Sequence, residues 1–357
     1  MLLLPPYGRK VLVVEKMIRK YGLNRKYKMF FAKLVSRIVL LALLFIFFYQ
    51  SAQVEASQQQ FAEWLENLKV EAIKRGISKK IVDSALTEVK LIPRVVELDR
   101  KQPEFSLTFN QYMERVVPRS RIKRARKKLA ENRALLEEIG NKFGVQPRFI
   151  VALWGIETDF GRVTGGFKLI SALTTMAYDG RRSKYFRKEL INALKILDGK
   201  HIRVNDMVGS WAGAMGQCQF MPSSFLNFAI DYDGDGRKDI WSTKADVFGS
   251  TANYLSSSGW KRDQTWGRVV TLPVGFDSSL ASLKVKKTIN EWQAIGVRRG
   301  NGGDLPIRDL EASIVYTEGE GSSAYMVYDN YRTILKWNRS TYFAVAVGTL
   351  ADRIVRL

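Results

Sequence analysis

Residues 149–156 read FIVALWGI, and no polar side chain interrupts them. Pro147 suits the first position of a helix and Gly161 suits a stop, so the sequence predicts a helix over residues 147–160. A helix that is apolar on every face has no side to turn toward water. The chain must therefore fold around this helix as a central element.

Glu157 follows the apolar run directly, which predicts a carboxylate at the end of a buried helix. Since ionised carboxylates are rarely buried alone, Glu157 either pairs with a cation such as Arg162 or stays protonated and serves as a proton donor. Position alone leaves both interpretations open. Asp159 cannot share its face, because residues two apart on a helix point in different directions. The region thus offers one acid, not the usual glycosidase pair.

The composition limits which other sites the chain can build. It has 357 residues with a formal net charge of +22, which favours polyanionic partners such as nucleic acid, an anionic lipid surface or a carboxylate-rich wall polymer. A single cysteine, Cys218, excludes an internal disulfide framework and cysteine-based zinc clusters. A single histidine, His201, excludes multi-histidine metal sites.

The amino-terminal region, residues 1–56, has the features of an export signal. Residues 38–49 read IVLLALLFIFFY, follow basic residues and precede a polar stretch with a possible cleavage site at 54–56. Counted from Met29, the segment falls within the usual signal length of about 15–30 residues, so we interpret Met29 as the true start. The sequence predicts a periplasmic protein, membrane-anchored if the segment is retained. Export argues against nucleic acid as the partner.

The remaining chain, residues 57–357, contains helical segments and one β-rich segment. Residues 57–264 are mainly helical, residues 265–328 contain short β-branched runs separated by Gly, Pro and Asp, and residues 329–357 return to the helical core. Apolar spacing predicts helices over 61–90 with a break at Gly76, 119–143, 147–160, 184–197, 222–230, 243–257 and 339–356. The basic run over 119–128 is interpreted as a solvated helix face rather than a nucleic-acid contact.

Residues 231–239 read DYDGDGRKD, which matches the first half of an EF-hand loop. Asp231, Asp233 and Asp235 occupy positions 1, 3 and 5, and Gly236 occupies position 6. Position 12 is Ser242 rather than an acid, and the next carboxylate is Asp246. A metal-free polar turn is the alternative interpretation of this loop.

Two long motifs resemble the lytic murein transglycosylase B family of bacterial cell-wall enzymes. Residues 154–158 read WGIET and precede Gly161 and Arg162, and residues 210–224 read SWAGAMGQCQFMPSS. The similarity extends from about Phe61 to the end of the chain and includes segments 179–182, 253–255, 259–260, 330–331 and 337–340.

The resemblance implies an α+β, mainly helical fold with a lysozyme-like core, a helical subdomain and a small β-rich subdomain. It also implies that Glu157 is the single catalytic acid and base. Glu157 would protonate the oxygen between N-acetylmuramic acid and N-acetylglucosamine, and the muramoyl 6-hydroxyl would close the ring as a 1,6-anhydro end. A hydrolytic muramidase and a non-catalytic peptidoglycan-binding protein are the alternatives.

The same resemblance implies sugar-groove residues for peptidoglycan strands with their stem peptides. They are Tyr112, Arg181, Arg182, Ser210, Gln219, Tyr254, Tyr331 and Trp337. Core packing is the alternative for Tyr254 and Tyr331, and solvation is the alternative for the two arginines. Trp337 stands where the family usually has tyrosine, so we expect stacking to survive and any hydroxyl hydrogen bond to be lost.

For the acidic loop, the resemblance implies one structural calcium ion and no organic cofactor. The family has an enlarged loop whose last ligand lies further along the chain. The implied ligands are Asp231, Asp233, Asp235, the Arg237 backbone carbonyl and Asp246.

Overall fold

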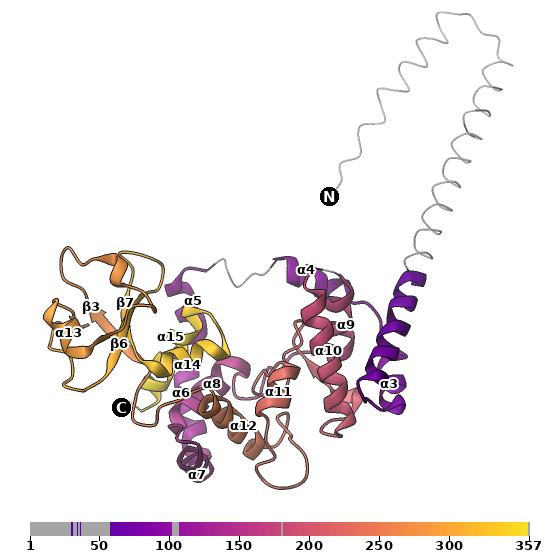
Figure 1. Ribbon diagram of the computed structural model, residues 1–357, viewed down its shortest axis with the longest axis horizontal. Helices are drawn as coiled ribbons and strands as arrows, with labels where there is room; N and C mark the ends of the chain where they lie inside the picture. The colour runs from indigo at the N-terminus through magenta and orange to yellow at the C-terminus, as the bar shows by residue number, and fades with distance from the viewer. Residues whose placement is uncertain are drawn as a thin grey trace, which may run out of the picture. The chain divides into compact units, whose positions relative to one another are not determined.

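The computed structural model describes residues 58–101, 107–179 and 181–355, together with residues 30, 34 and 36 (Figure 1). The predicted export signal therefore lies almost entirely outside the described residues. The chain divides into two compact units, residues 1–68 and 69–357, and the described part of the first is helical. Among the described residues, no helix combines the length and apolar character needed to cross a bilayer. All elements below belong to the second unit.

Helices dominate the described part of this unit, as the apolar spacing predicts. They are α3 (Lys79–Leu86), α4 (Pro93–Lys101), α5 (Phe109–Val116), α6 (Arg119–Glu131), α7 (Arg133–Phe143), α8 (Pro147–Thr158), α9 (Leu169–Asp179), α10 (Ser183–Asp198), α11 (Pro222–Phe228), α12 (Lys244–Ser257), α13 (Ile289–Ala294), α14 (Asp329–Trp337) and α15 (Thr341–Val355). The short 3₁₀ turns are η2 (Val204–Asp206) and η3 (Ser278–Leu280).

Helix α8 is the central element that its apolar sequence predicts. Its residues from Phe149 to Gly155 are all buried, and α6, α7, α12 and α15 pack against it. Because four helices pack against α8 and its residues are buried, it needs no polar face. The carboxyl end of α8 therefore lies where several elements meet.

The β-rich region forms one antiparallel sheet that has the strand order β4-β6-β7-β3-β5. Its strands are β3 (Gly267–Thr271), β4 (Lys287–Thr288), β5 (Arg298–Arg299), β6 (Glu311–Tyr316) and β7 (Ala324–Val327). Helix α13 lies with this sheet in Figure 1, and its Trp292 is fully buried and donates a 2.9 Å hydrogen bond to the carbonyl of Ala312. With Ile314, Met326 and Tyr328, this indole forms a separate small core.

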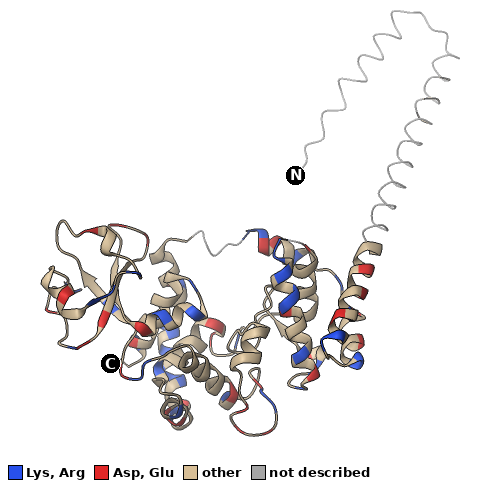
Figure 2. Cartoon of the chain, in the orientation of Figure 1, with Lys and Arg blue, Asp and Glu red and all other residues tan. Residues whose placement is uncertain are grey.

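The structure corrects two expectations about residues 119–143. The predicted single helix is two helices, α6 and α7, which break at the nearly buried Asn132. The basic run is also more than a solvated face, because Arg121 and Arg124 turn inward to Asp159. Across the described chain, Lys and Arg are spread over many elements and interleaved with acids (Figure 2).

Candidate active site

Glu157 lies in the last turn of α8 and is half-buried rather than buried. Its Oε1 accepts a 2.8 Å hydrogen bond from the indole Nε1 of Trp337, the last residue of α14. Tryptophan has no hydroxyl group, but its indole N–H supplies a donor at position 337, which the sequence analysis did not anticipate. An indole can only donate, so this contact fits a carboxylate oxygen that accepts.

A groove of about 860 Å³ opens beside Glu157. Helix α5 contributes Tyr112 and Arg115 to its lining, and the start of α15 with the preceding segment contributes residues 338–343. The rings of Tyr112 and Tyr342 lie 5.6 Å apart, and the Tyr342 hydroxyl donates to Glu318 at 3.0 Å. Arg115 and Tyr342 were missed by the sequence analysis, because helical spacing alone does not reveal which side chains border a groove.

The backbone that follows Glu157 is strained. Asp159, Phe160 and Gly161 all have positive φ angles, of 50°, 64° and 81°. Such a run is costly for non-glycine residues and persists only when its surroundings fix it. The Phe160 ring fills the space beside Gly155, where a Cβ atom would lie 2.7 Å from the ring. The helix therefore ends at Thr158, before the predicted stop at Gly161.

Arginines hold this turn through Asp159. The Asp159 carboxylate accepts hydrogen bonds from Arg124 at 2.8 Å and from the Nε of Arg162 at 2.8 Å, and Arg121 lies 3.6 Å away. Burial alone raises the pKa of Asp159, but the hydrogen bonds and charges of Arg124 and Arg162 outweigh it and hold that pKa below its usual value. Arg162, the cation predicted for Glu157, thus binds Asp159.

The second motif supports the end of α8. The Oε1 of Gln217 accepts a 2.7 Å hydrogen bond from the Trp154 indole, and the Gln217 carbonyl accepts one from the Thr158 hydroxyl at 3.0 Å. The Gln217 amide also fills the space beside Gly161, where a Cβ atom would lie 2.3 Å from its oxygen. The sequence analysis quoted Gln217 in the motif without assigning it a role.

Ser210 and Gln219 shape the same motif. The hydroxyl of Ser210 accepts a 3.0 Å hydrogen bond from the backbone N–H of Ala214. Gln219 has a positive φ of 50°, and its amide nitrogen donates to the carbonyls of Thr164 at 3.1 Å and Gly216 at 3.0 Å. These contacts fix the loop that follows α8. The two strands that border it are β1 (Phe167–Lys168) and β2 (Val208–Gly209).

The aromatic candidates divide into two groups. The Tyr254 ring lies 4.7 Å from the Trp337 ring, and the Tyr254 hydroxyl donates to the Lys336 carbonyl at 2.7 Å. Tyr254 therefore packs against Trp337 and holds the end of α14. Tyr331 is fully buried and packs against Trp266 at 6.4 Å. Core packing is therefore the arrangement observed for Tyr331, which presents no ring face to a sugar in this structure.

Arg181 and Arg182 are not simply solvated. Both guanidinium groups bind the fully buried carboxylate of Asp99, Arg181 at 2.7 Å, although each arginine side chain remains about half exposed. The two arginines offset part of the desolvation cost of burying this carboxylate. Neither arginine lines the groove beside Glu157.

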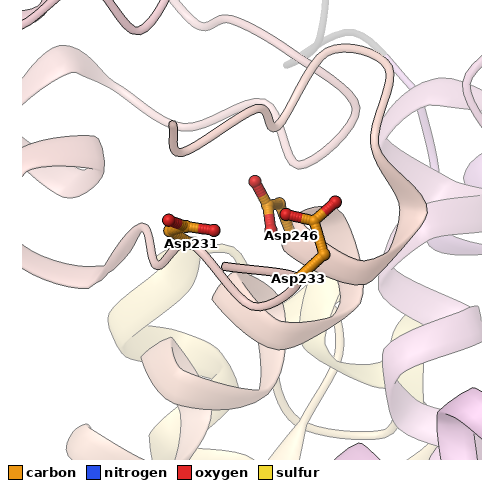
Figure 3. A group of neighbouring side chains, drawn as sticks. All are labelled: Asp231, Asp233 and Asp246. Atoms are coloured by element: carbon orange, nitrogen blue, oxygen red, sulfur yellow. The ribbon is translucent and has the colours of Figure 1, made fainter. Parts of the chain in front are cut away.

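Three of the predicted metal ligands converge. The carboxylates of Asp231, Asp233 and Asp246 each place an oxygen within 4.8 Å of the others (Figure 3). Calcium–oxygen distances are about 2.3–2.6 Å, so oxygens on opposite sides of one ion lie about 5 Å apart. Asp246 is fully buried, and burial raises its pKa. The three carboxylates therefore fit one coordination sphere, which a divalent cation would stabilise.

The other loop residues behave differently. Asp235 is not part of this cluster, and its Oδ1 accepts a 2.8 Å hydrogen bond from the Arg237 backbone N–H. The Arg237 guanidinium contacts Asp239 at 3.3 Å. The Asp239 carboxylate accepts hydrogen bonds from the backbone N–H groups of Trp241 and Ser242, so it stabilises the turn that follows it. The Arg237 carbonyl stays a predicted ligand.

Comparisons with known proteins agree over most of the chain. The transglycosylase SLT domain family model matches residues 60–352. Membrane-bound lytic murein transglycosylase B of Escherichia coli (strain K12) is 29% identical over 315 residues, which cover 83% of this chain and 82% of that protein.

Solved structures give the same result. SltB3 from Pseudomonas aeruginosa, in complex with NAG-anhNAM-pentapeptide, is 41% identical with a TM-score of 0.80, covering 82% of this chain and 79% of that one. The Escherichia coli lytic transglycosylase Slt35 in complex with calcium is 26% identical with a TM-score of 0.70. The match covers 81% of this chain and 92% of the Slt35 chain. These similarities confirm the predicted α+β, mainly helical fold with a lysozyme-like core.

Proposed function

Because the chain belongs to the transglycosylase SLT domain family, we propose that it cleaves the β-1,4 bond between N-acetylmuramic acid and N-acetylglucosamine in peptidoglycan without consuming water. The observation that carries this proposal is Glu157, which is half-buried at the end of α8, borders a groove of about 860 Å³ and accepts a hydrogen bond from Trp337. Its substrate is the glycan strand with its stem peptides, and the product ends in a 1,6-anhydromuramoyl group.

The proposed reaction uses one carboxyl group twice. Protonated Glu157 donates its proton to the glycosidic oxygen as the bond to the muramoyl anomeric carbon breaks, while the 2-acetamido oxygen stabilises that carbon. Ionised Glu157 then accepts the proton of the muramoyl 6-hydroxyl, whose oxygen bonds to the anomeric carbon. The proton count balances, and Glu157 ends protonated.

The lining of the groove fits this chemistry better than hydrolysis by a pair of carboxyl groups. Among the described residues that line it, Glu157 is the only acid. Inverting hydrolases need a second carboxylate to activate water, and retaining ones with a protein nucleophile need it to attack the sugar. A self-capturing sugar needs neither, so one glutamate is sufficient.

Sugar contacts are proposed for residues that border the groove or the acid. Tyr112 and Trp337 offer aromatic faces that suit the C–H surfaces of sugars. Arg115 and Arg339 place positive charge in the groove, which suits a substrate that carries carboxylates. Ser210, Gln219 and Tyr254 act by positioning the loop and the indole. We assign no sugar contact to Tyr331, and the exposed halves of Arg181 and Arg182 stay candidates for peptide carboxylates.

We further propose that Asp231, Asp233 and Asp246 hold one calcium ion in a structural role. The spacing and burial of these carboxylates support the ion, and the Slt35 structure was obtained with calcium. The ion would clamp the loop and take no part in the reaction. For location, we propose export to the periplasm, and the name of the Escherichia coli relative describes that protein as membrane-bound.

Digestion of purified cell wall in oxygen-18 water tests the proposed function. We expect muropeptides that end in unlabelled 1,6-anhydromuramic acid, one water lighter than hydrolytic products, by mass spectrometry. The Glu157→Gln variant keeps the side-chain shape, removes the transferable proton and should release several orders of magnitude less product while remaining folded. Labelled, reducible ends would identify a hydrolytic muramidase, and wall binding without product would identify a binding protein.

A further inference from the structure

One carboxylate of the β-rich region contacts two helices that border the groove beside Glu157. Glu318 lies in the turn between β6 and β7, and its Oε1 accepts hydrogen bonds from the backbone N–H of Phe109 at 2.9 Å and from the Tyr342 hydroxyl at 3.0 Å. Phe109 is the first residue of α5, and Tyr342 lies in the first turn of α15. Both helices contribute to the groove, so Glu318 connects two of the elements that form it.

The turn that carries Glu318 is fixed by its own hydrogen bonds. The Glu318 backbone N–H donates to the Ser322 hydroxyl at 3.0 Å, and that hydroxyl donates to the Gly319 carbonyl at 2.7 Å. Gly319 and Gly321 have positive φ angles of 94° and 83°, which glycine adopts without strain, so the chain reverses within these few residues. The Glu318 side chain therefore extends from a defined backbone position.

Helix α5 depends on partners outside the helix at its first turn. The first N–H groups of a helix have no acceptor within it, and the Thr108 side chain satisfies that of Gln111. Glu318 accepts the N–H of Phe109, and a negative charge at this end of a helix is favourable because of the helix dipole. Tyr112 lies on the same short helix and lines the groove, so the placement of α5 sets the position of its ring.

The Tyr342 ring carries the second contact of Glu318 to the groove. This ring lies 5.4 Å from the Phe109 ring, edge to face, and 5.6 Å from the Tyr112 ring. Burial, together with the hydrogen bond and the charge of Glu318, raises the pKa of Tyr342, so its hydroxyl stays protonated and donates at neutral pH. A ring that is held by its neighbours and by its hydroxyl keeps one orientation, and Tyr112 packs against it.

We propose that Glu318 is a positioning residue that holds Tyr112 and Tyr342 in place for the glycan strand. This inference rests on the proposed function, which makes that strand the substrate. Aromatic side chains that are already ordered lose less conformational entropy when a sugar stacks on them. Glu318 is not among the described residues that line the groove, so its removal should weaken binding of the strand rather than the proton steps at Glu157.

Cleavage kinetics on soluble glycan strands test the inference. Glu318→Ala should raise KM roughly tenfold and leave kcat within about twofold of the parent. Glu318→Gln keeps an acceptor oxygen and should recover most of the loss. The matched control, Glu320→Ala, removes the same charge from an exposed residue of the same turn and should cleave like the parent.

The Tyr342→Phe variant tests the route through the aromatic ring. It removes only the hydroxyl contact and should raise KM less than Glu318→Ala does. The double variant should lose no more than Glu318→Ala alone, because both changes break the same contact. Fully additive losses would show that the two residues act independently and would overturn this route.

Binding of undigested strands, measured by calorimetry, separates this inference from the proposed function. In a Glu157→Gln background, Glu318→Ala should weaken binding roughly tenfold, whatever bond the parent enzyme forms. Labelled, reducible ends from the parent would reject only the proposed reaction. Unchanged KM and unchanged strand affinity in Glu318→Ala, with or without a lower Tm, would reject the positioning role. If that variant does not fold, parent-like KM in Tyr342→Phe would reject it.

Discussion

At the scale of single residues, a hydrogen bond from Trp337 holds one oxygen of the reacting carboxyl group. Trp337 donates to Oε1 of Glu157 at 2.8 Å, and Tyr254 packs behind the indole at 4.7 Å between ring centres. An indole N–H cannot accept, so Oε1 of Glu157 acts as the acceptor in this contact. We infer that Trp337 orients Glu157 for both proton steps.

Replacing Trp337 separates stacking from hydrogen bonding. Trp337→Phe keeps an aromatic face and removes the donor, and the loss of a hydrogen bond to a charged group, about 1.5–3 kcal/mol, should lower kcat by roughly tenfold or more. Trp337→Tyr supplies a hydroxyl donor and should recover part of the loss. Initial rates of cleavage of soluble glycan strands measure the loss in the Phe variant and the recovery in the Tyr variant. A Phe variant as active as the parent would show that the indole only packs.

At the scale of elements, the junction of α6 and α8 holds the acid in place. Arg121 and Arg124 of α6 meet Asp159 directly after α8, and Arg162 reaches the same carboxylate. Three residues with positive φ follow Thr158, so the turn depends on these contacts and on the Phe160 ring beside Gly155. Glu157 lies only two residues before Asp159, which ties its position to the ion pairs.

The Asp159→Asn variant tests this junction through pH. Asparagine also tolerates the left-handed conformation, so the variant should fold and lose about 2 kcal/mol of unfolding free energy at neutral pH. The native pKa of Asp159 is below its usual value, so its contribution is complete above about pH 4 and is lost as pH falls through that lower pKa.

Urea unfolding of parent and variant from pH 7 down to about pH 3 measures the difference. The gap in free energy should narrow only at the acidic end of this range. A gap that stays constant across the whole range would show that the carboxylate charge does not hold the turn.

At the scale of the whole molecule, the acidic loop connects elements that are distant in sequence. Asp246 lies in the first turn of α12 and is fully buried. Its carboxylate accepts hydrogen bonds from the backbone N–H groups of Tyr232 at 2.7 Å and of Asp239 at 2.6 Å. The Tyr232 hydroxyl donates to Glu138 of α7 at 2.8 Å. Since α7 and α12 both pack on α8, a cation in the loop would stabilise the frame around Glu157.

Thermal unfolding with and without calcium tests that role. A free concentration one hundred times the Kd should add about 2.7 kcal/mol and raise the Tm by roughly 5 °C. Asp233→Asn should remove most of the rise. The matched control is Asp83→Asn, at an exposed side chain of α3 outside the loop, and it should keep the rise. A Tm that does not respond to calcium would leave the loop as a metal-free turn.

The sequence by itself determined the parts that depend on local pattern. The uninterrupted apolar run, with Pro147 before it and Gly161 after it, predicts a central helix, and the structure confirms α8 with Glu157 at its end. Spacing of acids and glycines likewise predicts a cation loop, and three of its carboxylates do converge. The two motifs identified the family, which the comparisons confirm.

Only the tertiary structure decided which side chains meet. Arg162 forms an ion pair with Asp159, and both Arg181 and Arg182 form ion pairs with Asp99. Tyr331 is buried, whereas Tyr112 lines the groove beside Glu157. The physical reason is that periodicity states which face of an element is covered, but not which neighbour covers it. Contacts between residues far apart in the chain depend on how the elements pack, and the groove beside Glu157 exists only because α5, the end of α8 and the start of α15 come together there.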